Sequence, residues 1–454
     1  MPARKFHVQV GPDLTEDHVL MLGETVMKRL RIPPRSQPVL RFGALRLPVR
    51  IAKAPKRDCI RVSQGLAKKM GLFADCPLRV RHRPDTGEIA FGPLIGVLIS
   101  RDYPALRDRP FGSITAFCQE LTAACRQQGA YVYFFTPQGI GSSPETVVGW
   151  VYSGGWRQVH VPAPDVLNNR LTRRSLENQG NVQSLMRDVK NRFGGHVFNE
   201  KFLDKTEVFA ALGSDASLRR YLPESHAVSG LATLRSMLRK YPVVFLKPTR
   251  GSLGMGIIRL AKTGTQRWTA SFTTASGIRT AAYPGPNGVL HALAGKIKSV
   301  RYLVQQGLNL ISVAGRPVDF RVLTQKNRNG QWTVTSTAAR IAGGQHYVSN
   351  VARGGTLAPA RSAIARSNLP PACKGPAILS LRRAALDIAR GIESRIPYHF
   401  GELGIDLGID TAGRVWLLEV NSKPSKNENT SLREGRIRPS VRMMVQYACH
   451  LSGF

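Results

Sequence analysis

The first part of the chain alternates short apolar runs with Pro and Gly. The runs RLPVRIAKA, CIRVS and PLRVRHRPDTGEIAF are typical of short strands, and PDTG between two such runs predicts a hairpin. We therefore expect a small β-rich domain over residues 1–92.

A strand, helix and second strand are predicted from Pro93 onward. LIGVLIS and AYVYFFTP have the composition of buried strands. Between them Ile114, Phe117, Leu121 and Cys125 recur at helical spacing, and GSITAFCQELTAACRQQG ends in a glycine typical of a helix end. This order predicts a βαβ unit with a parallel sheet. We assign it to residues 93–168, which close with the β stretch VVGWVYSGGWRQVHVP and the turn-rich PAPDVLNNR.

Helical and strand patterns alternate over residues 169–450. Helices are expected at about 181–192 and 231–240, before the strand VVFLKP. Residues 263–298 are rich in Thr, Ser, Gly and Ala with weak patterning, which we interpret as a mobile lobe or lid. Strand patterns return at YLVQQGLNLISV, DFRVLTQKN and QWTVTSTAARIA, and are followed by the helix LRRAALDIARGIESRI and a last strand pair. We divide this region into a lid lobe at about 206–303 and a C-terminal lobe at about 304–450.

Composition limits the classes of function. The 454 residues suffice for two or three domains, and a net charge of +36 attracts polyanions, although a basic proteome or a need for solubility explains such a charge equally well. No apolar run could span a membrane and no secretory signal is visible, so we expect a cytoplasmic protein. The six cysteines form no CxxC pair, which argues against a zinc site or a disulfide framework. Charge is the sole argument for nucleic acid, because no nucleic-acid-binding motif is present.

The stretch VVFLKPTRGSLGMGII suggests a phosphate-binding loop in which the lysine precedes the glycines, whereas in a P-loop it follows them. A P-loop is excluded because Ile257 stands where its lysine must be, and a dinucleotide fingerprint fails because Arg259 occupies the third glycine position. There remains a strand that ends at Lys247, followed by a flexible Gly/Ser loop. Backbone N–H groups of such a loop can close over phosphate oxygens while the lysine supplies charge. The alternative is a hairpin loop beside a solvated lysine.

The segment GELGIDLGIDTAGRVWLLEVNSKPS predicts an antiparallel hairpin around the turn DTAG. A loop of two or four residues would place Leu418 opposite Ile405 or Leu407 and keep the apolar side chains on one face. A three-residue loop would set apolar side chains against charges, so we favour the even register. The opposite face would then carry Glu402, Asp406, Glu419 and Asn421.

These polar side chains predict a hard oxygen site. Asp406, Glu419 and Asn421 offer two carboxylates and an amide oxygen, which suit Mg²⁺, with Mn²⁺ as a substitute. The alternative is an exposed polar sheet face.

The order of lysine, glycine-rich loop, hinge strand and terminal D…ExN set resembles the ATP-grasp superfamily, which includes D-alanine–D-alanine ligases and RimK-like amino-acid ligases. More narrowly, NNRL, FNEKFLDKTEVFAAL, LKPTRGSLGMGI, LVQQGLNL, DFRVLTQKN, ARIAGG…SNVARGG and LEVNSKPS resemble the YheC/YheD group of endospore coat-associated proteins. The resemblance covers about residues 165–430, and the narrower one reaches back to about Pro93. It implies an α/β (α+β) fold, with an ATP-grasp domain after a βαβ pre-ATP-grasp domain and the small β-rich domain.

The resemblance also implies a role for individual residues. Lys205 and Lys247 would be the two phosphate lysines, and Gln306 stands near the position of a glutamate that often binds ribose. In RimK-like enzymes an arginine often precedes the asparagine that Asn350 matches, and here Ser349 stands in its place. The implied loop over the triphosphate is Gly251, Ser252, Gly254 and Gly256, the implied adenine contacts are Gln305 and Leu308, the implied phosphoryl contacts are Arg321, Arg340 and Asn350, and the implied metal ligands are Asp406, Glu419 and Asn421.

The implied activity is an ATP- and Mg²⁺-dependent carboxylate–amine ligase that proceeds through an acyl-phosphate. Its carboxylate and amine substrates are not identified by the sequence, and an anionic polymer or coat proteins are the implied partners. The alternative is a coat or scaffold protein that binds ATP without turnover, so association with the spore coat is implied beside the cytoplasmic location.

Overall fold

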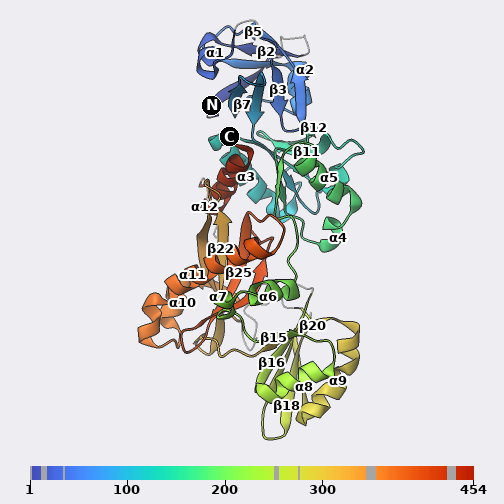
Figure 1. Ribbon diagram of the computed structural model, residues 1–454, viewed down its shortest axis with the longest axis vertical. Helices are drawn as coiled ribbons and strands as arrows, with labels where there is room; N and C mark the ends of the chain where they lie inside the picture. The colour runs from blue at the N-terminus through green and yellow to red at the C-terminus, as the bar shows by residue number, and fades with distance from the viewer. Residues whose placement is uncertain are drawn as a thin grey trace.

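The structure is a computed structural model that describes residues 3–11, 18–33, 36–249, 255–274, 277–343, 354–426 and 436–454. Within these residues the chain forms four main β-sheets arranged along the length of the molecule, with the fourth sheet in chain order lying between the second and the third (Figure 1). No helix in the described part of the chain is long and apolar enough to cross a membrane.

The first sheet has eight strands in the described residues, in the order β4-β3-β8-β7-β1-β6-β2-β5. The predicted hairpin at PDTG is confirmed as β7–β8, where Arg83 pairs with Glu88 and Gly87 takes a positive φ of 64° that suits glycine. The elements are β1 Arg4–Gly11, β2 Val19–Leu22, α1 Glu24–Leu30, β3 Val39–Phe42, β4 Leu45–Pro48, β5 Arg50–Lys53, β6 Ile60–Ser63, α2 Gln64–Met70, β7 Cys76–Arg83 and β8 Glu88–Gly92.

The second sheet contains the predicted βαβ unit. Strands β9 and β10 pair in parallel around α3, and the sheet order is β12-β11-β10-β9-β13-β14. Because β14 also belongs to it, the boundary expected at residue 168 does not separate two sheets; the three-residue β14 is too short for a recognisable strand pattern. The elements are β9 Leu94–Leu98, η1 Gly112–Ile114, α3 Thr115–Gln128, β10 Tyr131–Phe135, η2 Pro137–Gly139, β11 Thr146–Tyr152, β12 Trp156–Pro162, β13 Val166–Asn169, α4 Arg174–Glu177, α5 Gly180–Asn191 and β14 His196–Phe198.

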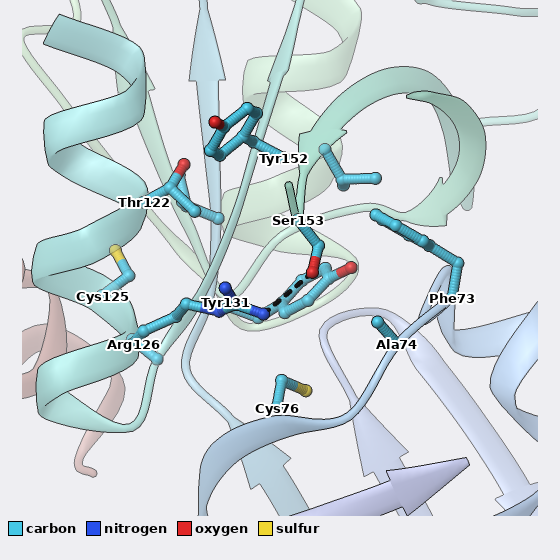
Figure 2. A pocket seen from close by; sticks show the side chains of 12 residues that line it. Phe73, Ala74, Cys76, Thr122, Cys125, Arg126, Tyr131, Tyr152 and Ser153 are labelled. Carbon is cyan, nitrogen blue, oxygen red and sulfur yellow. Dashed lines mark hydrogen bonds between the residues drawn. The ribbon is translucent and has the colours of Figure 1, made fainter. Parts of the chain in front are cut away.

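The first two sheets share one hydrophobic core, which runs from Val8 and Leu40 to Leu98 and Val161. A cavity of about 20 Å³ lies at their junction, where Arg126 donates a hydrogen bond of 3.0 Å to the hydroxyl of Ser153. Figure 2 shows the side chains that line it. This volume holds about one water molecule and is too small for a substrate. The junction is therefore a packing interface.

The third sheet lies in the region expected to be the lid lobe, and we keep that name for it; its order is β15-β20-β16-β17-β18-β19, with α8 and α9 packed on one face (Figure 1). Residues 263–298, interpreted from the sequence as a mobile lobe or lid, form the regular hairpin β18–β19 and the helix α9 over most of their length. The buried positions of β18 are Trp268, Ala270, Ser271 and Thr273, and the polar Ser and Thr among them weaken its hydrophobic pattern. The elements are β15 Ser225–Ala227, α8 Leu231–Lys240, β16 Val243–Pro248, β17 Ile258–Lys262, β18 Arg267–Thr274, β19 Gly277–Pro284, α9 Gly285–Ser299 and β20 Tyr302–Gln306.

The fourth sheet forms the C-terminal lobe, in the order β24-β23-β22-β25-β26, with β21 paired to β22. Helix α11 packs on this sheet, while the last helix, α12, returns to α3 and the second sheet. The elements are α6 Lys205–Gly213, α7 Ala216–Arg219, β21 Ser312–Val313, β22 Arg316–Lys326, β23 Trp332–Ile341, β24 Thr356–Pro359, α10 Ala360–Arg366, α11 Pro371–Arg395, β25 Glu402–Ile409, β26 Val415–Asn421 and α12 Pro439–Ser452.

The β25–β26 hairpin has a different register from the expected one. The amide of Asp410 bonds to the carbonyl of Arg414 at 3.0 Å, so the loop has an odd length. The even-loop prediction is wrong, and Leu417, instead of Leu418, lies opposite Leu407. An irregularity between Asp406 and Leu407 then shifts the pairing by one residue. From Asp406 back to Gly404 the strands therefore pair in the register that was expected for an even loop. Asp406 therefore lies opposite Glu419 although the loop is odd.

Glu402 binds the C-terminal lobe to the second sheet through buried charges. Its side chain is 1% exposed, receives Arg170 at 2.5 Å and Gln325 at 3.1 Å, and pairs with Lys426. Burial alone would raise the pKa of Glu402, but Lys426 and Arg170 outweigh it and lower the pKa. The carboxylate is therefore ionised and neutralises two buried cations.

We expect Glu402→Gln to reduce the free energy of unfolding by about 3 kcal/mol, because it leaves Arg170 and Lys426 buried without their carboxylate. Urea denaturation followed by tryptophan fluorescence measures this change. The control is Glu24→Gln, which removes an exposed carboxylate paired with Lys28 and Arg57 and should hardly move the transition. Equal effects of the two variants would contradict the assigned role of Glu402.

Candidate functional site at the junction of two lobes

Lys247 projects from the end of β16 and is held by a buried glutamine. Its Nζ donates to Oε1 of Gln305 at 2.5 Å, and Gln305, which is 2% exposed, donates from Nε2 to the hydroxyl of Ser225 at 2.9 Å. Gln305 thus fixes the lysine relative to three neighbouring strands, β15, β20 and β16.

The pKa of Lys247 is lowered to about 8, chiefly by burial. The carboxylates of Glu419, Asp406 and Asp319 act in the opposite direction, and the ammonium group of Lys205 adds to the lowering. These interactions join a lysine of the lid lobe to charges of the C-terminal lobe. A phosphate group placed beside Lys247 would favour its charged form.

Lys205 is the first residue of α6, which begins with an N-cap from Asp204. The Asp204 carboxylate accepts a bond of 2.9 Å from the amide of Thr206, and so fixes where the helix starts. The Nζ atom of Lys205 lies 3.0 Å from Oε1 of Glu419 on β26. The helix start and the last strand therefore bring these two residues together.

Two arginines and two aspartates form a buried network on the face of β22. The strand register sets Asp319 opposite Arg340 and Arg321 opposite Asp406. Arg340 binds Asp319 through two bonds of 2.6 and 3.0 Å and reaches Oδ2 of Asp406 at 2.9 Å. Arg321 binds both oxygens of Asp406, with its Nη2 at 3.2 Å from Oδ2. All four side chains lie in a largely buried region, at 5–8% exposure.

The network fixes the charge of its members. Burial works to raise the pKa of Asp406, but Arg321 and Arg340 overcome it and lower the pKa, so the carboxylate is ionised at neutral pH. Burial works to lower the pKa of Arg340, and the carboxylates of Asp406 and Asp319 overcome it and raise the pKa. Each charge therefore needs the others to stay buried.

The donor atoms on this face have the chemistry that Mg²⁺ prefers. Asp406 lies opposite Glu419, and Asn421 lies opposite Gly404, so Asp406, Glu419 and Asn421 project from one face. The described residues contain no group of three or more His, Cys, Asp or Glu side chains that could hold a metal by themselves. Two carboxylates and an amide fit Mg²⁺ in the manner of sites that depend on substrate phosphates to complete the coordination.

Comparison with known proteins shows the family to which the chain belongs. A family model described as "YheC/D like ATP-grasp" matches residues 194–451, which include both lobes. The chain belongs to the YheC/D-like ATP-grasp family. The α/β fold expected from the resemblance, with an ATP-grasp domain after other sheet-bearing parts, is thereby confirmed.

Two curated relatives agree with the family assignment. The endospore coat-associated protein YheD of Bacillus subtilis (strain 168) is 30% identical over 361 residues, which are 78% of this chain and 79% of the relative. The endospore coat-associated protein YheC of the same strain is 25% identical over 320 residues, 68% of this chain and 85% of the relative. Among solved structures, D-cycloserine synthetase DcsG overlaps with a TM-score of 0.47 at 14% identity, covering 78% of this chain and 99% of its own.

The glycine-rich loop and Asn350 were also expected in the ATP-grasp site. Gly251, Ser252, Gly254 and Asn350 lie outside the described residues. Gly256, with a positive φ of 71°, donates its amide to the carbonyl of Thr273 at 3.3 Å.

Gln306 and Leu308, which were expected near ribose and adenine, lie at the end of β20 and just after it. Leu308 lies partly buried just after the strand. The Oε1 atom of Gln306 accepts a bond of 2.8 Å from the amide of Glu224, so its side chain is bound to the neighbouring chain segment. This contact weakens the expected role of Gln306 at the ribose.

Asp319 and Ser225 had no expected role in the site. Asp319 orients Arg340 through the two-bond contact, and Ser225 holds Gln305. The D-x-R spacing of Asp319 and Arg321 was a usable signal, because alternate strand residues share a face. Ser225 has no such signal, since its partner is 80 residues away along the chain.

We expect the pKa of Lys247 to change with its charged neighbours. Glu419→Gln should lower it below about 8, because the carboxylate favours the ammonium form, and Lys205→Met should raise it. NMR of reductively ¹³C-methylated protein, titrated without nucleotide, measures both shifts. Glu24→Gln, in the first domain, is the matched control and should change nothing. If the pKa of Lys247 were the same in all variants, the two lobes would not form one site.

Proposed function

We propose that the protein is an ATP- and Mg²⁺-dependent ligase that joins a carboxylate to an amine through an acyl-phosphate. The observation that supports this most is the convergence of Lys205, Lys247, Arg321 and Arg340 on the carboxylates of Asp319, Asp406 and Glu419. The four cations outnumber the three carboxylates, and they come from both lobes. Such a site suits a polyphosphate that binds together with a divalent metal.

Nucleotide binding would use residues of both lobes. Lys205 and Lys247 would contact the phosphates, and the loop that includes Gly251, Ser252, Gly254 and Gly256 would cover them. Gln305 and Leu308 would frame the adenine, Leu308 through its backbone. Mg²⁺, or Mn²⁺ in its place, would neutralise phosphate charge when bound, and its ligands would be Asp406, Glu419 and Asn421.

The chemistry asks for positioned cations and no protein nucleophile. A carboxylate oxygen of the substrate attacks the γ-phosphorus, and the bond between this phosphorus and the ADP oxygen breaks. The amine nitrogen then attacks the acyl carbon, phosphate departs with the C–O bond electrons, and the nitrogen loses a proton as the amide forms. Charge develops on phosphoryl oxygens in both steps, and fixed guanidinium donors stabilise it.

Arg340 is the donor that we assign to those oxygens. It commits Nε and Nη2 to Asp319 and Asp406, and among the described residues its Nη1 has no hydrogen-bond partner. The paired carboxylates hold the guanidinium plane, so the free edge keeps one orientation. Arg321 would act beside it, and Asn350 is the third contact that the family pattern implies.

The second candidate is a coat or scaffold protein that binds ATP without ligase turnover. The names of YheD and YheC as endospore coat-associated proteins favour it. Either function is compatible with coat proteins as partners and with a place at the spore coat. Turnover distinguishes the two candidates.

We expect ATP to bind only together with Mg²⁺, and Lys247→Ala or Glu419→Gln to weaken binding by about 10- to 100-fold, the effect of losing one charge-assisted contact. Isothermal titration calorimetry with and without Mg²⁺ measures this. Lys374→Ala, which removes a half-buried lysine on α11, is the control and should bind normally. Undiminished binding by both site variants would refute the site assignment.

A separate test concerns turnover. ADP release, screened over carboxylates and amines with product mass spectrometry, should be stimulated by one pair. Arg340→Lys should then lower kcat by about 10-fold or more with little change in ATP affinity, because lysine lacks the two-pronged donor. Arg383→Lys, exposed on α11, is the control. A flat response over a broad screen would favour the scaffold.

A further inference from the structure

The outer helical layer of the lid lobe is strongly basic. From Ser225 to Val318 the sequence contains no aspartate or glutamate. Arg235 and Arg239 on α8 and Lys296 and Lys298 on α9 are exposed, and none of the four has a carboxylate within salt-bridge distance among the described residues. On the same helix Lys240 is paired with Glu224, but these four cations are not neutralised in this way, and such a surface attracts anions.

This layer faces away from the candidate nucleotide site. Val244 and Leu246 of β16 pack in the core beneath α8 and α9, and residues alternate along a strand, so Lys247 points to the opposite face of the sheet. The phosphates of a nucleotide bound at Lys247 therefore cannot neutralise the outer layer. Its cations are available to a different partner.

A shallow hollow lies on the exposed side of α8. It has a volume of about 410 Å³ and is lined by Ala232, Arg235, Ser236, Arg239 and Lys240. Ala232 and Ser236 alternate with Arg235 and Arg239 at helical spacing, so the four residues share one face of α8. The two small side chains leave space between the guanidinium groups. Arginine binds carboxylates through two parallel bonds, which suits the capture of acidic side chains.

The surface lacks the features of other polyanion or membrane sites. The large hydrophobic side chains that are exposed in the described part of this lobe are Met255 and Val300, and no aromatic side chain is among them. Bases therefore have no exposed Phe, Tyr or Trp to stack on in this described part of the lobe, and a bilayer has no aromatic anchor there. A hollow over one helix also suits a single narrow chain better than a duplex.

We propose that the α8–α9 face of the lid lobe docks an acidic polypeptide segment. The contact is electrostatic, centred on Arg235 and Arg239, with Lys296 and Lys298 extending it onto α9. It is separate from the proposed nucleotide site and does not depend on ligase activity. A carboxylate-rich partner would be held beside the lobe that carries Lys247.

The experiment measures binding of fluorescein-labelled poly-L-glutamate to the full-length protein by anisotropy, without nucleotide. Arg235→Glu/Arg239→Glu should weaken binding about 10-fold or more at low salt, and about 300 mM NaCl should weaken binding of the unaltered protein. Arg382→Glu/Arg383→Glu makes the same charge change on exposed positions of α11 and is the matched control, expected to retain most of the affinity. Arg235→Gln/Arg239→Gln, with a smaller loss expected, covers the case in which charge reversal disturbs folding.

Two results would overturn the proposal. An equal loss in the α8 and α11 variants would show attraction by net charge alone. Preferential binding of duplex DNA of matched charge, lost in the α8 variant, would assign the face to nucleic acid. Because nucleotide is absent from the assay, failure of ATP binding leaves this readout unaffected.

Discussion

The carboxylate of Asp406, held beneath two guanidinium groups, is the interaction on which the rest of the candidate site depends. A buried carboxylate without cations would be costly, and so would two buried arginines without carboxylates, by several kcal/mol each. Asp319, Arg321, Arg340 and Asp406 satisfy one another across β23, β22 and β25. With this network in place, the adjoining strand β26 presents Glu419 to Lys205.

The second constraint is that the site is divided between two lobes. Lys247 belongs to the sheet of the lid lobe, whereas the carboxylates that favour its charged form belong to the C-terminal lobe. Gln305 holds the lysine from within its own sheet, so its position follows the lobe as a whole. A bound polyphosphate with Mg²⁺ would supply the charge that completes both halves, and the outer basic layer would remain open to other partners.

The sequence was sufficient for most of the helices and strands, because alternation and helical spacing mark strands and helices with apolar cores, whereas the roles of the site residues stay predictions. It failed where tertiary packing decides. The odd loop after Asp410 could not be distinguished from an even one, and the irregularity beside Leu407 that brings Asp406 opposite Glu419 leaves no mark in the hydrophobic pattern. Strand β18 was missed because the polar residues Ser271 and Thr273 are among its buried positions, and β14 because three residues show no period. The partner of Gln306, an amide at Glu224, is a contact that only the folded chain defines.

The most direct test of a nucleotide site between the lobes is hydrogen–deuterium exchange with a non-hydrolysable ATP analogue, with and without Mg²⁺. A nucleotide site between the lobes predicts slower amide exchange in Val243–Pro248 of β16 and in Val415–Asn421 of β26 together, and only when analogue and Mg²⁺ are both present. Slower exchange in one of these strands alone, or in neither, would contradict it.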